Sequence, residues 1–180
     1  MARISTGTYL RGRETMQRRE LLFGVVREPP SPRFGHQALL VRLTVLLDPV
    51  ARDRGAGVVC LSPMDVVLAE GRALVLQPDL MFISHARRAI IRDRIYGAPD
   101  LVVEVISPST ARQDRGLKLR LYQEYGVREC WLVGEQERRL EVIAFSGDRS
   151  RRRVFKGDAP IQSSVMGALP FAAADVFGEP

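Results

Sequence analysis

The sequence predicts a single mixed α/β domain, and three observations lead to that prediction. The chain has 180 residues, 46% of them hydrophobic, which is enough apolar material for one full core but leaves a second independent domain cramped. Short segments rich in Val, Leu and Ile have the length and composition of strands. Two longer segments repeat their apolar residues at helical spacing. Strands and helices mixed in one short chain indicate a sheet that is covered by helices.

The N-terminal part of the chain divides into a lead-in, a strand and a helix. Residues 1–19 are rich in arginine and have little periodic apolar content, so we expect a basic, partly ordered lead-in that carries little chemistry. The domain proper is expected over residues 20–180, beginning with a short strand over residues 21–26. Apolar residues at helical spacing from His36 onward predict the first core helix. Pro49 lacks a backbone donor, so this helix either kinks there or restarts.

The rest of the chain predicts several strands and one more helix. The strand segments are rich in β-branched and apolar residues, and they are residues 57–61, 65–68, 73–76, 79–83, 101–106, 130–133 and 140–145. The turn Glu70-Gly71 suggests a hairpin, and we expect the first three segments to form an antiparallel meander. Residues 101–106 are mostly β-branched and should lie centrally in the sheet. A helical repeat over residues 114–125 predicts the second helix, which ends at Gly126.

Composition narrows the classes of function. No apolar run approaches the roughly 20 residues that span a bilayer, and the N-terminus lacks the apolar stretch of a signal peptide, so we expect a cytoplasmic protein without membrane contact. The net charge is +6 and the pI is about 10, which favours a polyanionic partner such as nucleic acid. Cys60 and Cys130 lie far apart in apolar segments, so we expect buried free thiols. No glycine-rich phosphate loop is present.

Glu104 is the most informative residue, because it stands in the middle of the apolar segment 101–106. A carboxylate at the centre of a buried strand costs free energy unless a partner compensates it. One interpretation is a metal ligand. The alternatives are a buried ion pair with an arginine, or a strand with one solvated face.

Asp79 is a candidate for a second carboxylate, because it follows Pro78 at the start of a strand. Two oxygens from adjacent strands can hold one Mg²⁺ that keeps several waters. On its own, Asp79 is also typical of a turn. The other Pro-Asp pair is Pro99-Asp100, but Asp100 lies four residues from Glu104, roughly 13 Å along a strand. Asp100 is therefore expected to be structural.

Lys118 lies on the second helix, in line with Asp114 and Tyr122 at intervals of four residues. Apolar neighbours on the same helix place it at the edge of the buried face, where a lysine requires an anion. The alternatives are a lysine whose stem lies along the surface with its amine in water, or a simple helical pair with Asp114.

Four segments together resemble the Uma2 family of restriction endonucleases, within the PD-(D/E)XK nuclease superfamily. They are Gln77-Pro78-Asp79-Leu80, Ala98 to Thr110 with its Glu-Val-Ile-Ser-Pro-Ser-Thr sequence, Asp114 to Tyr122, and Gly126 to Val133. The resemblance runs from about Glu20 to Pro170. It implies a restriction-endonuclease-like α/β fold, in which helices flank a mixed central β-sheet.

The resemblance also implies a site and an activity. Asp79 and Glu104 would bind Mg²⁺ or Mn²⁺ together with the carbonyl of Val105, and Lys118 would replace the superfamily lysine, because Ile106 holds the usual position. Glu20 matches an N-terminal family glutamate and is a further acidic candidate, the alternative being an exposed glutamate at the start of a strand. Phe23 stands where relatives have an aspartate, a departure that weakens an accessory role. His36 matches a histidine that relatives place near the site, although a local hydrogen bond explains it equally well.

The function implied is metal-dependent endonuclease cleavage of nucleic acid. DNA is the expected substrate, and a homodimer or higher homo-oligomer is the expected assembly. The alternative is a catalytically inactive protein of the same fold that binds nucleic acid or another partner. The chain retains Asp79, Glu104 and Lys118, which favours the enzyme. It has Phe23 in place of the usual aspartate, which favours the alternative.

Overall fold

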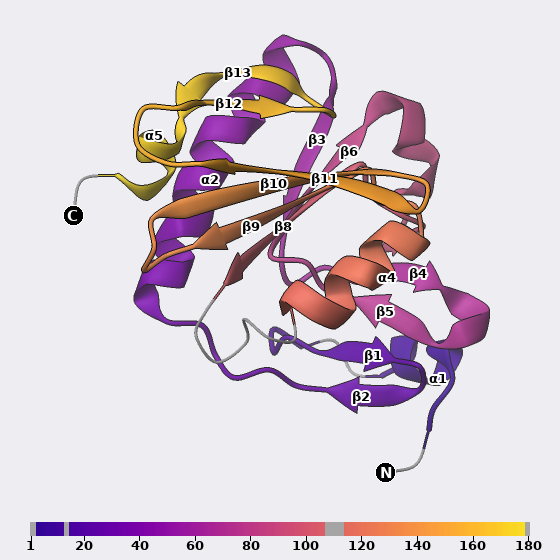
Figure 1. Cartoon of the computed structure of the whole chain (residues 1–180). Coiled ribbons are helices and arrows are strands. Elements are labelled where there is room, and N and C mark those ends of the chain that lie inside the picture. The colour runs from indigo at the N-terminus through magenta and orange to yellow at the C-terminus, as the bar shows by residue number, and fades with distance from the viewer. Residues whose placement is uncertain (1–2, 13–14, 107–113, 179–180) are drawn as a thin grey trace.

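A six-stranded mixed sheet forms the centre of the molecule (Figure 1). We analysed a computed structural model that describes residues 3–12, 15–106 and 114–178. The strand order in the central sheet is β11-β10-β9-β8-β6-β3. Its strands are β3 (Gly57–Leu61), β6 (Leu80–Ser84), β8 (Leu101–Ile106), β9 (Glu129–Gly134), β10 (Arg139–Ser146) and β11 (Arg149–Phe155). Strands β8 and β9 run parallel, and the other neighbours run antiparallel.

Strand β8 lies between β6 and β9, and all of its residues are buried. The central position expected for residues 101–106 is therefore confirmed. A β-branched strand is stable there because both of its faces pack against other layers. The carboxylate of Glu104 is consequently held far inside the molecule.

A second sheet packs beside the first. Its five strands have the order β2-β1-β5-β4-β7, and they are β1 (Glu20–Leu22), β2 (Val25–Arg27), β4 (Val66–Ala69), β5 (Leu74–Leu76) and β7 (Ile95–Tyr96). Strands β4 and β7 pair in parallel. A separate hairpin, β12 (Pro160–Ser163) with β13 (Gly167–Ala172), lies near the C-terminus.

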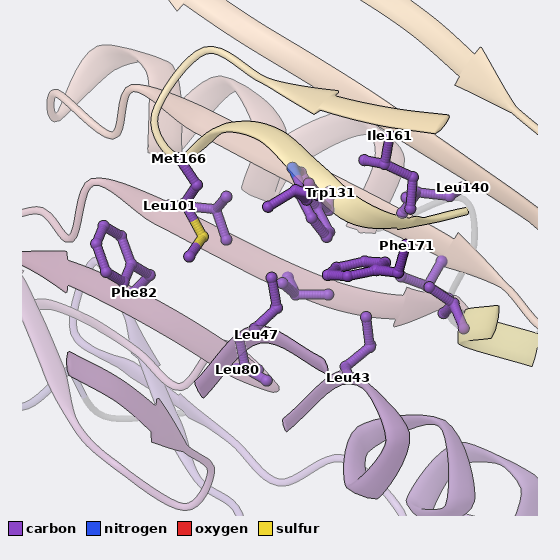
Figure 2. Packing of buried hydrophobic residues seen from close by; sticks show 14 of the residues in the cluster. Leu43, Leu47, Leu80, Phe82, Leu101, Trp131, Leu140, Ile161, Met166 and Phe171 are labelled. Atoms are coloured by element: carbon purple, nitrogen blue, oxygen red, sulfur yellow. The ribbon is translucent and has the colours of Figure 1, made fainter. Parts of the chain in front are cut away.

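Helices and smaller elements cover both faces of the central sheet. Helix α2 (Phe34–Asp53), the short helix α5 (Ala173–Phe177) and the β12–β13 hairpin pack on one face. Figure 2 shows the apolar side chains of this layer, with Trp131 of β9 between Phe171 and Leu101. The other face packs against helix α4 (Leu119–Glu124) and the five-stranded sheet. Helix α1 (Thr6–Leu10) packs on the outer side of that smaller sheet through Tyr9. The short 3₁₀ turns η1 (Glu70–Arg72) and η2 (His85–Ile90) complete the connections.

The structure corrects the expected strand over residues 21–26. The segment forms two strands, β1 and β2, joined by a tight turn at Phe23 and Gly24, whose φ angles are 50° and 87°. Two consecutive positive φ angles are typical of the hairpin turn that matches strand twist. Phe23 is therefore a turn residue, and its ring lies 5.3 Å from the guanidinium of Arg72.

The expected meander is also wrong, although its strands exist. Strand β3 pairs with β6 in the central sheet, whereas β4 and β5 form a hairpin in the smaller sheet. Neighbouring residues of β4 pack into different cores: Val66 contacts the central layer, and Val67 contacts the α1 layer. A strand buried on both faces gives no alternating pattern, so its sheet is not readable from local sequence.

The two helices differ from expectation in detail. Helix α2 continues through Pro49 to Asp53 and does not restart. The second helix begins as a π-helical turn, η3 (Asp114–Lys118), and continues as α4 to Glu124. Gly126 follows with φ of 92°, as expected of a residue that ends a helix. Cys130 is buried and Cys60 only partly so, and the structure describes no disulfide at either residue.

Candidate active site

Four side chains predicted from the sequence meet at one place. Glu20 lies at the start of β1, Asp79 directly precedes β6, Glu104 is in β8, and Lys118 ends the turn η3. Each of the four is 4% exposed or less. The Nζ atom of Lys118 lies 2.8 Å from Oε1 of Glu20 and 3.2 Å from Oε1 of Glu104. The structure therefore brings together elements from both sheets and from the second helix.

Strand pairing places Asp79 beside Glu104. Leu80 of β6 pairs with Val103 of β8, so Asp79 is one step further along and adjoins Glu104. The backbone N–H of Val105 donates a hydrogen bond to Oδ2 of Asp79 at 2.7 Å. This bond fixes the orientation of the carboxylate. Val105 thus enters the site through its N–H, and a metal contact of its carbonyl stays a prediction.

The second helix supplies two groups to Glu104. Lys118 and Tyr122 are one helical turn apart and both face the carboxylate. The hydroxyl of Tyr122 donates to Oε1 of Glu104 at 2.5 Å, and the ring is 1% exposed. The π-helical turn before Lys118 alters the register at which the lysine enters, and such turns occur often at functional sites.

Arg18 is a site residue that the sequence analysis missed. Its Nη1 lies 2.5 Å from Oδ1 of Asp79, and its Nη2 lies 3.3 Å from Oε2 of Glu104. The same Nη2 is 3.8 Å from Oε1 of Glu20. One guanidinium therefore contacts all three carboxylates. A buried ion pair with an arginine was one of the alternatives for Glu104. Arg18 forms this ion pair, and it pairs with Asp79 as well.

Gln77 joins the N-terminal segment to the rest of the site. Its backbone N–H donates to Oε1 of Glu20 at 3.1 Å, and its carbonyl accepts a bond from Nη2 of Arg18. Its side-chain oxygen accepts from the backbone N–H of Arg19 at 3.1 Å, while its side-chain nitrogen donates to Asp65 at 2.9 Å. The first residue of the Gln-Pro-Asp motif thus positions Arg18 and Glu20 against Asp79.

Burial and charge shift the pKa values of these groups in opposite directions. Burial raises the pKa of Asp79 to about 7, against the opposing effect of Arg18 and with a contribution from Glu104. Burial also acts to raise the pKa of Glu104, but Lys118, Arg18 and the hydrogen bond from Tyr122 outweigh it and lower this pKa. Desolvation and the neighbouring Glu104 raise the pKa of Tyr122. The two adjoining carboxylates are thus shifted in opposite directions, with the pKa of Asp79 raised and that of Glu104 lowered.

His36, at the start of α2, lies at the edge of the cluster. Its Nε2 is 3.5 Å from Oδ1 of Asp79. Burial, reinforced by the charge of Arg18, lowers the pKa of this imidazole. The structure thus places the histidine near the candidate site and favours its neutral form.

Asp100 lies outside the site, as the spacing predicted. Its carboxylate accepts from the backbone N–H of Ser84 at 2.8 Å and pairs with Arg128 at 3.2 Å and Arg87 at 3.4 Å. These partners join η2, the start of β8 and the start of β9. Asp100 therefore stabilises the fold at the beginning of β8, away from the end where Glu104 lies.

The donor set fits a hard divalent cation. Mg²⁺ prefers carboxylate and carbonyl oxygens and keeps several waters, so it needs only one or two protein carboxylates. Asp79 and Glu104 supply such oxygens, and the guanidinium of Arg18 shows that both face a common cation position. Among the described residues, no group of three or more His, Cys, Asp or Glu side chains is arranged as a ready metal cage. An ion here would therefore rely largely on water.

One sequence signal could have identified Arg18. Side chains two residues apart in an extended segment point the same way, so Arg18 and Glu20 share a face. Tyr122 had the same kind of signal, because it lies four residues after Lys118 on the helix. Gln77 had no such signal, since two of its site contacts use backbone atoms.

The fold defines the class of a mixed α/β protein, and comparison with solved structures finds a similar fold. The crystal structure of "a putative nuclease belonging to DUF820" from Anabaena variabilis matches with a TM-score of 0.78, over 97% of each chain and at 18% sequence identity. At that identity the match shows the fold alone. The family model of Uma2, described as "Putative restriction endonuclease", matches residues 7–172. The chain belongs to the Uma2 family.

The family and the fold expected from the sequence are therefore confirmed. No curated protein matches the chain. In the part of the chain that the structure describes, no helix is long and apolar enough to cross a membrane.

Proposed function

We propose that this chain is a metal-dependent endonuclease that hydrolyses phosphodiester bonds in nucleic acid, with DNA as the substrate. One observation carries the proposal: Asp79, Glu104, Glu20 and Lys118 meet in a buried cluster although they come from four separate elements. Burying that many ionisable groups costs free energy, and a packed apolar core would be more stable. Clusters of this kind with shifted pKa values are typical of functional sites.

Each side chain has a role that follows from its contacts. Asp79 and Glu104 would hold Mg²⁺ or Mn²⁺, with the carbonyl of Val105 as a further ligand. Such an ion supplies charge stabilisation to a phosphoryl group and lowers the pKa of a bound water. Tyr122 and Lys118 orient Glu104 by direct hydrogen bonds. The ammonium of Lys118 also provides positive charge where a phosphate gains negative charge during hydrolysis.

Glu20 is the third carboxylate of the cluster and contacts Lys118, as Glu104 does. Because Glu20 and Glu104 both contact Nζ, the lysine is held in one position. A lysine fixed in this way is pre-organised for the developing charge and loses little conformational entropy during the reaction. We therefore assign Glu20 the positioning of Lys118 as its main role.

A specific observation favours the alternative function, a non-cutting protein that binds nucleic acid. Arg18 already compensates Asp79 and Glu104 by ion pairs, so the cluster does not require a metal for charge balance. A protein of this kind would retain the basic surface and bind nucleic acid in a salt-dependent manner without hydrolysing it.

The test is metal binding by calorimetry, combined with cleavage of plasmid DNA and of single-stranded substrates. Wild type is compared with Asp79→Asn and Glu104→Gln, which keep side-chain volume and remove the charge. Asp158→Asn is the matched control, because it removes a carboxylate from an exposed turn. We expect Mn²⁺-dependent cutting by wild type and the control, and a loss of at least about a hundredfold in both site variants.

The outcomes separate the two functions. Cutting that depends on both carboxylates supports the endonuclease. Salt-dependent DNA binding without cutting, unchanged in both variants, would instead establish the non-catalytic binder. Association of two copies stays a prediction, which light scattering of the purified protein measures directly.

A further inference from the structure

Arg18 contacts all three carboxylates of the candidate site. The side chain of Arg18 is 23% exposed, whereas those of Asp79 and Glu104 are 3% and 2% exposed. Arg18 is thus the more solvent-accessible partner of these ion pairs. A divalent ion that binds the same oxygens must take the position of this guanidinium.

We propose that Arg18 is a resident cation that holds the site together without metal and leaves when a divalent ion binds. This inference rests on the proposed function, since it assumes that Asp79 and Glu104 are metal ligands. It goes further by assigning a positioning role to Arg18, a residue outside the predicted site. Metal binding and the position of residues 15–19 are then coupled.

The backbone around Arg18 allows such a movement. Residues 15–19 form neither a helix nor a strand, and β1 begins only at Glu20. Arg18 can therefore leave without breaking regular hydrogen bonds of a sheet or helix. The carbonyl of Gln77 accepts from Nη2 of Arg18. The adjacent backbone at Arg19 is held by the side chain of Gln77 and by the hydroxyl of Tyr9, so the movement concerns chiefly the Arg18 side chain.

The present position of Arg18 also has a cost. Its Nε is buried and has no hydrogen-bond partner among the described residues. A buried donor without an acceptor is unfavourable, and movement of the side chain into water removes that penalty. The planar guanidinium nevertheless matches two carboxylates at once, which explains why arginine suits this position in the absence of metal.

Charge balance favours the exchange. Glu20, Asp79 and Glu104 contact two single positive charges, those of Arg18 and Lys118. Replacement of Arg18 by a divalent ion supplies one more positive charge to the same carboxylates. The ion is therefore the stronger partner, provided that it retains enough waters to complete its coordination.

The experiment measures Mn²⁺ affinity and thermal unfolding for wild type, Arg18→Gln and Arg18→Lys. Arg19→Gln is the matched control, because Arg19 is the next residue but pairs with Glu28 outside the site. Removal of the competing cation should tighten Mn²⁺ binding in Arg18→Gln by on the order of tenfold, within the range of typical coupling between two ligands. We expect the same variant to unfold at a lower temperature than wild type without metal, and Arg18→Lys to lie between them.

Hydrogen exchange of wild type gives a second readout that needs no variant. Saturating Mn²⁺ should speed exchange of backbone amides in residues 15–19, because the anchor at Arg18 is lost, and slow exchange around Asp79 and Glu104. Unchanged or slower exchange in residues 15–19 would contradict the proposal.

The results separate this inference from the proposed function. Equal Mn²⁺ affinity in wild type and in folded Arg18→Gln overturns the resident cation and leaves the metal site standing. Binding by Arg18→Gln but not by wild type supports the inference strongly. Absence of binding by both proteins overturns the inference together with the metal-dependent function.

Discussion

Two buried acidic groups of this protein are built in different ways. Glu129 of β9 is fully buried, and the donors that the structure describes around it are neutral: the indole N–H of Trp131 at 2.7 Å, the hydroxyls of Ser163 and Ser164, and the backbone N–H of Ser164. Glu104 of β8 is buried as deeply, but Lys118 and Arg18 contact it and Asp79 adjoins it.

The difference shows that burial of a carboxylate does not by itself indicate function. The neutral donors around Glu129 come from the β12–β13 hairpin and from its own strand, so their bonds attach that hairpin to the central sheet. The charged partners of Glu104 come from three other elements and include groups that could exchange for an ion or a substrate. For these two glutamates the type of partner separates the structural carboxylate from the candidate catalytic one. Asp100 shows that arginine partners alone do not mark a site, because it is buried, pairs with Arg87 and Arg128, and is structural.

The largest effect on stability is expected at Glu129. Glu129→Ala leaves the Trp131 and serine donors without an acceptor, so we expect a loss of about 4 kcal/mol in the free energy of unfolding. Glu129→Gln keeps one acceptor oxygen and should lose about half as much. Urea denaturation measures both. Neither variant should change Mn²⁺ affinity, and a change in affinity without loss of stability would break the comparison.

A smaller effect is expected on the pH dependence of stability. It concerns Asp79, which adjoins Glu104 in the candidate site. The pKa of Asp79 is raised to about 7 from an ordinary value near 3.8, so the folded protein holds a proton that the unfolded chain releases. The stabilisation is complete below the unfolded pKa and is lost as pH rises through about 7. Relative to Asp79→Asn, metal-free wild type should therefore lose stability with increasing pH.

The size and control of this effect follow from proton linkage. The relative slope should reach at most about 1.4 kcal/mol per pH unit between pH 4 and pH 7 and flatten above that range. Urea denaturation of both proteins at a series of pH values checks it. Parallel stability curves for the two proteins would show that Asp79 is ionised throughout, held by Arg18.

The smallest effect is expected at Phe23, where relatives carry an aspartate. Because Phe23 lies in the β1–β2 turn and contacts Arg72, Phe23→Asp should change Mn²⁺ affinity by less than about twofold. Its effect on stability should stay within about 1 kcal/mol, since a better turn residue replaces a partly buried ring. A large gain in Mn²⁺ affinity would contradict this prediction and would show that the metal site includes the β1–β2 turn.

Much of the fold was accessible from the sequence, because its strongest signals are local. The apolar repeat of α2, the β-branched segment of β8 and the glycine after α4 each specify an element through neighbouring residues. The pairing of β3 with β6, the two-sheet arrangement, and the C-terminal β12, β13 and α5 depend on distant contacts, and the local pattern did not predict them.

The candidate site shows the same division. The four predicted residues lie together because the elements that carry them pack next to each other. These residues are Glu20, Asp79, Glu104 and Lys118. Arg18 was missed because it precedes the first strand in a segment without periodic pattern, 86 residues from Glu104. The shared face with Glu20 was the one local signal for Arg18, and its contacts with Asp79 and Glu104 form only when the sheets are assembled.

The charged cluster joins the two sheets, and this position limits when it can assemble during protein synthesis. Glu20 belongs to the smaller sheet and Glu104 to the larger one, and Lys118 connects them. Contacts between residues so distant in sequence require long loops to close, which costs conformational entropy. A growing chain that ends before residue 118 already carries the three carboxylates but lacks the lysine between Glu20 and Glu104. The ribosome must therefore release well over half of the polypeptide before the cluster can assemble.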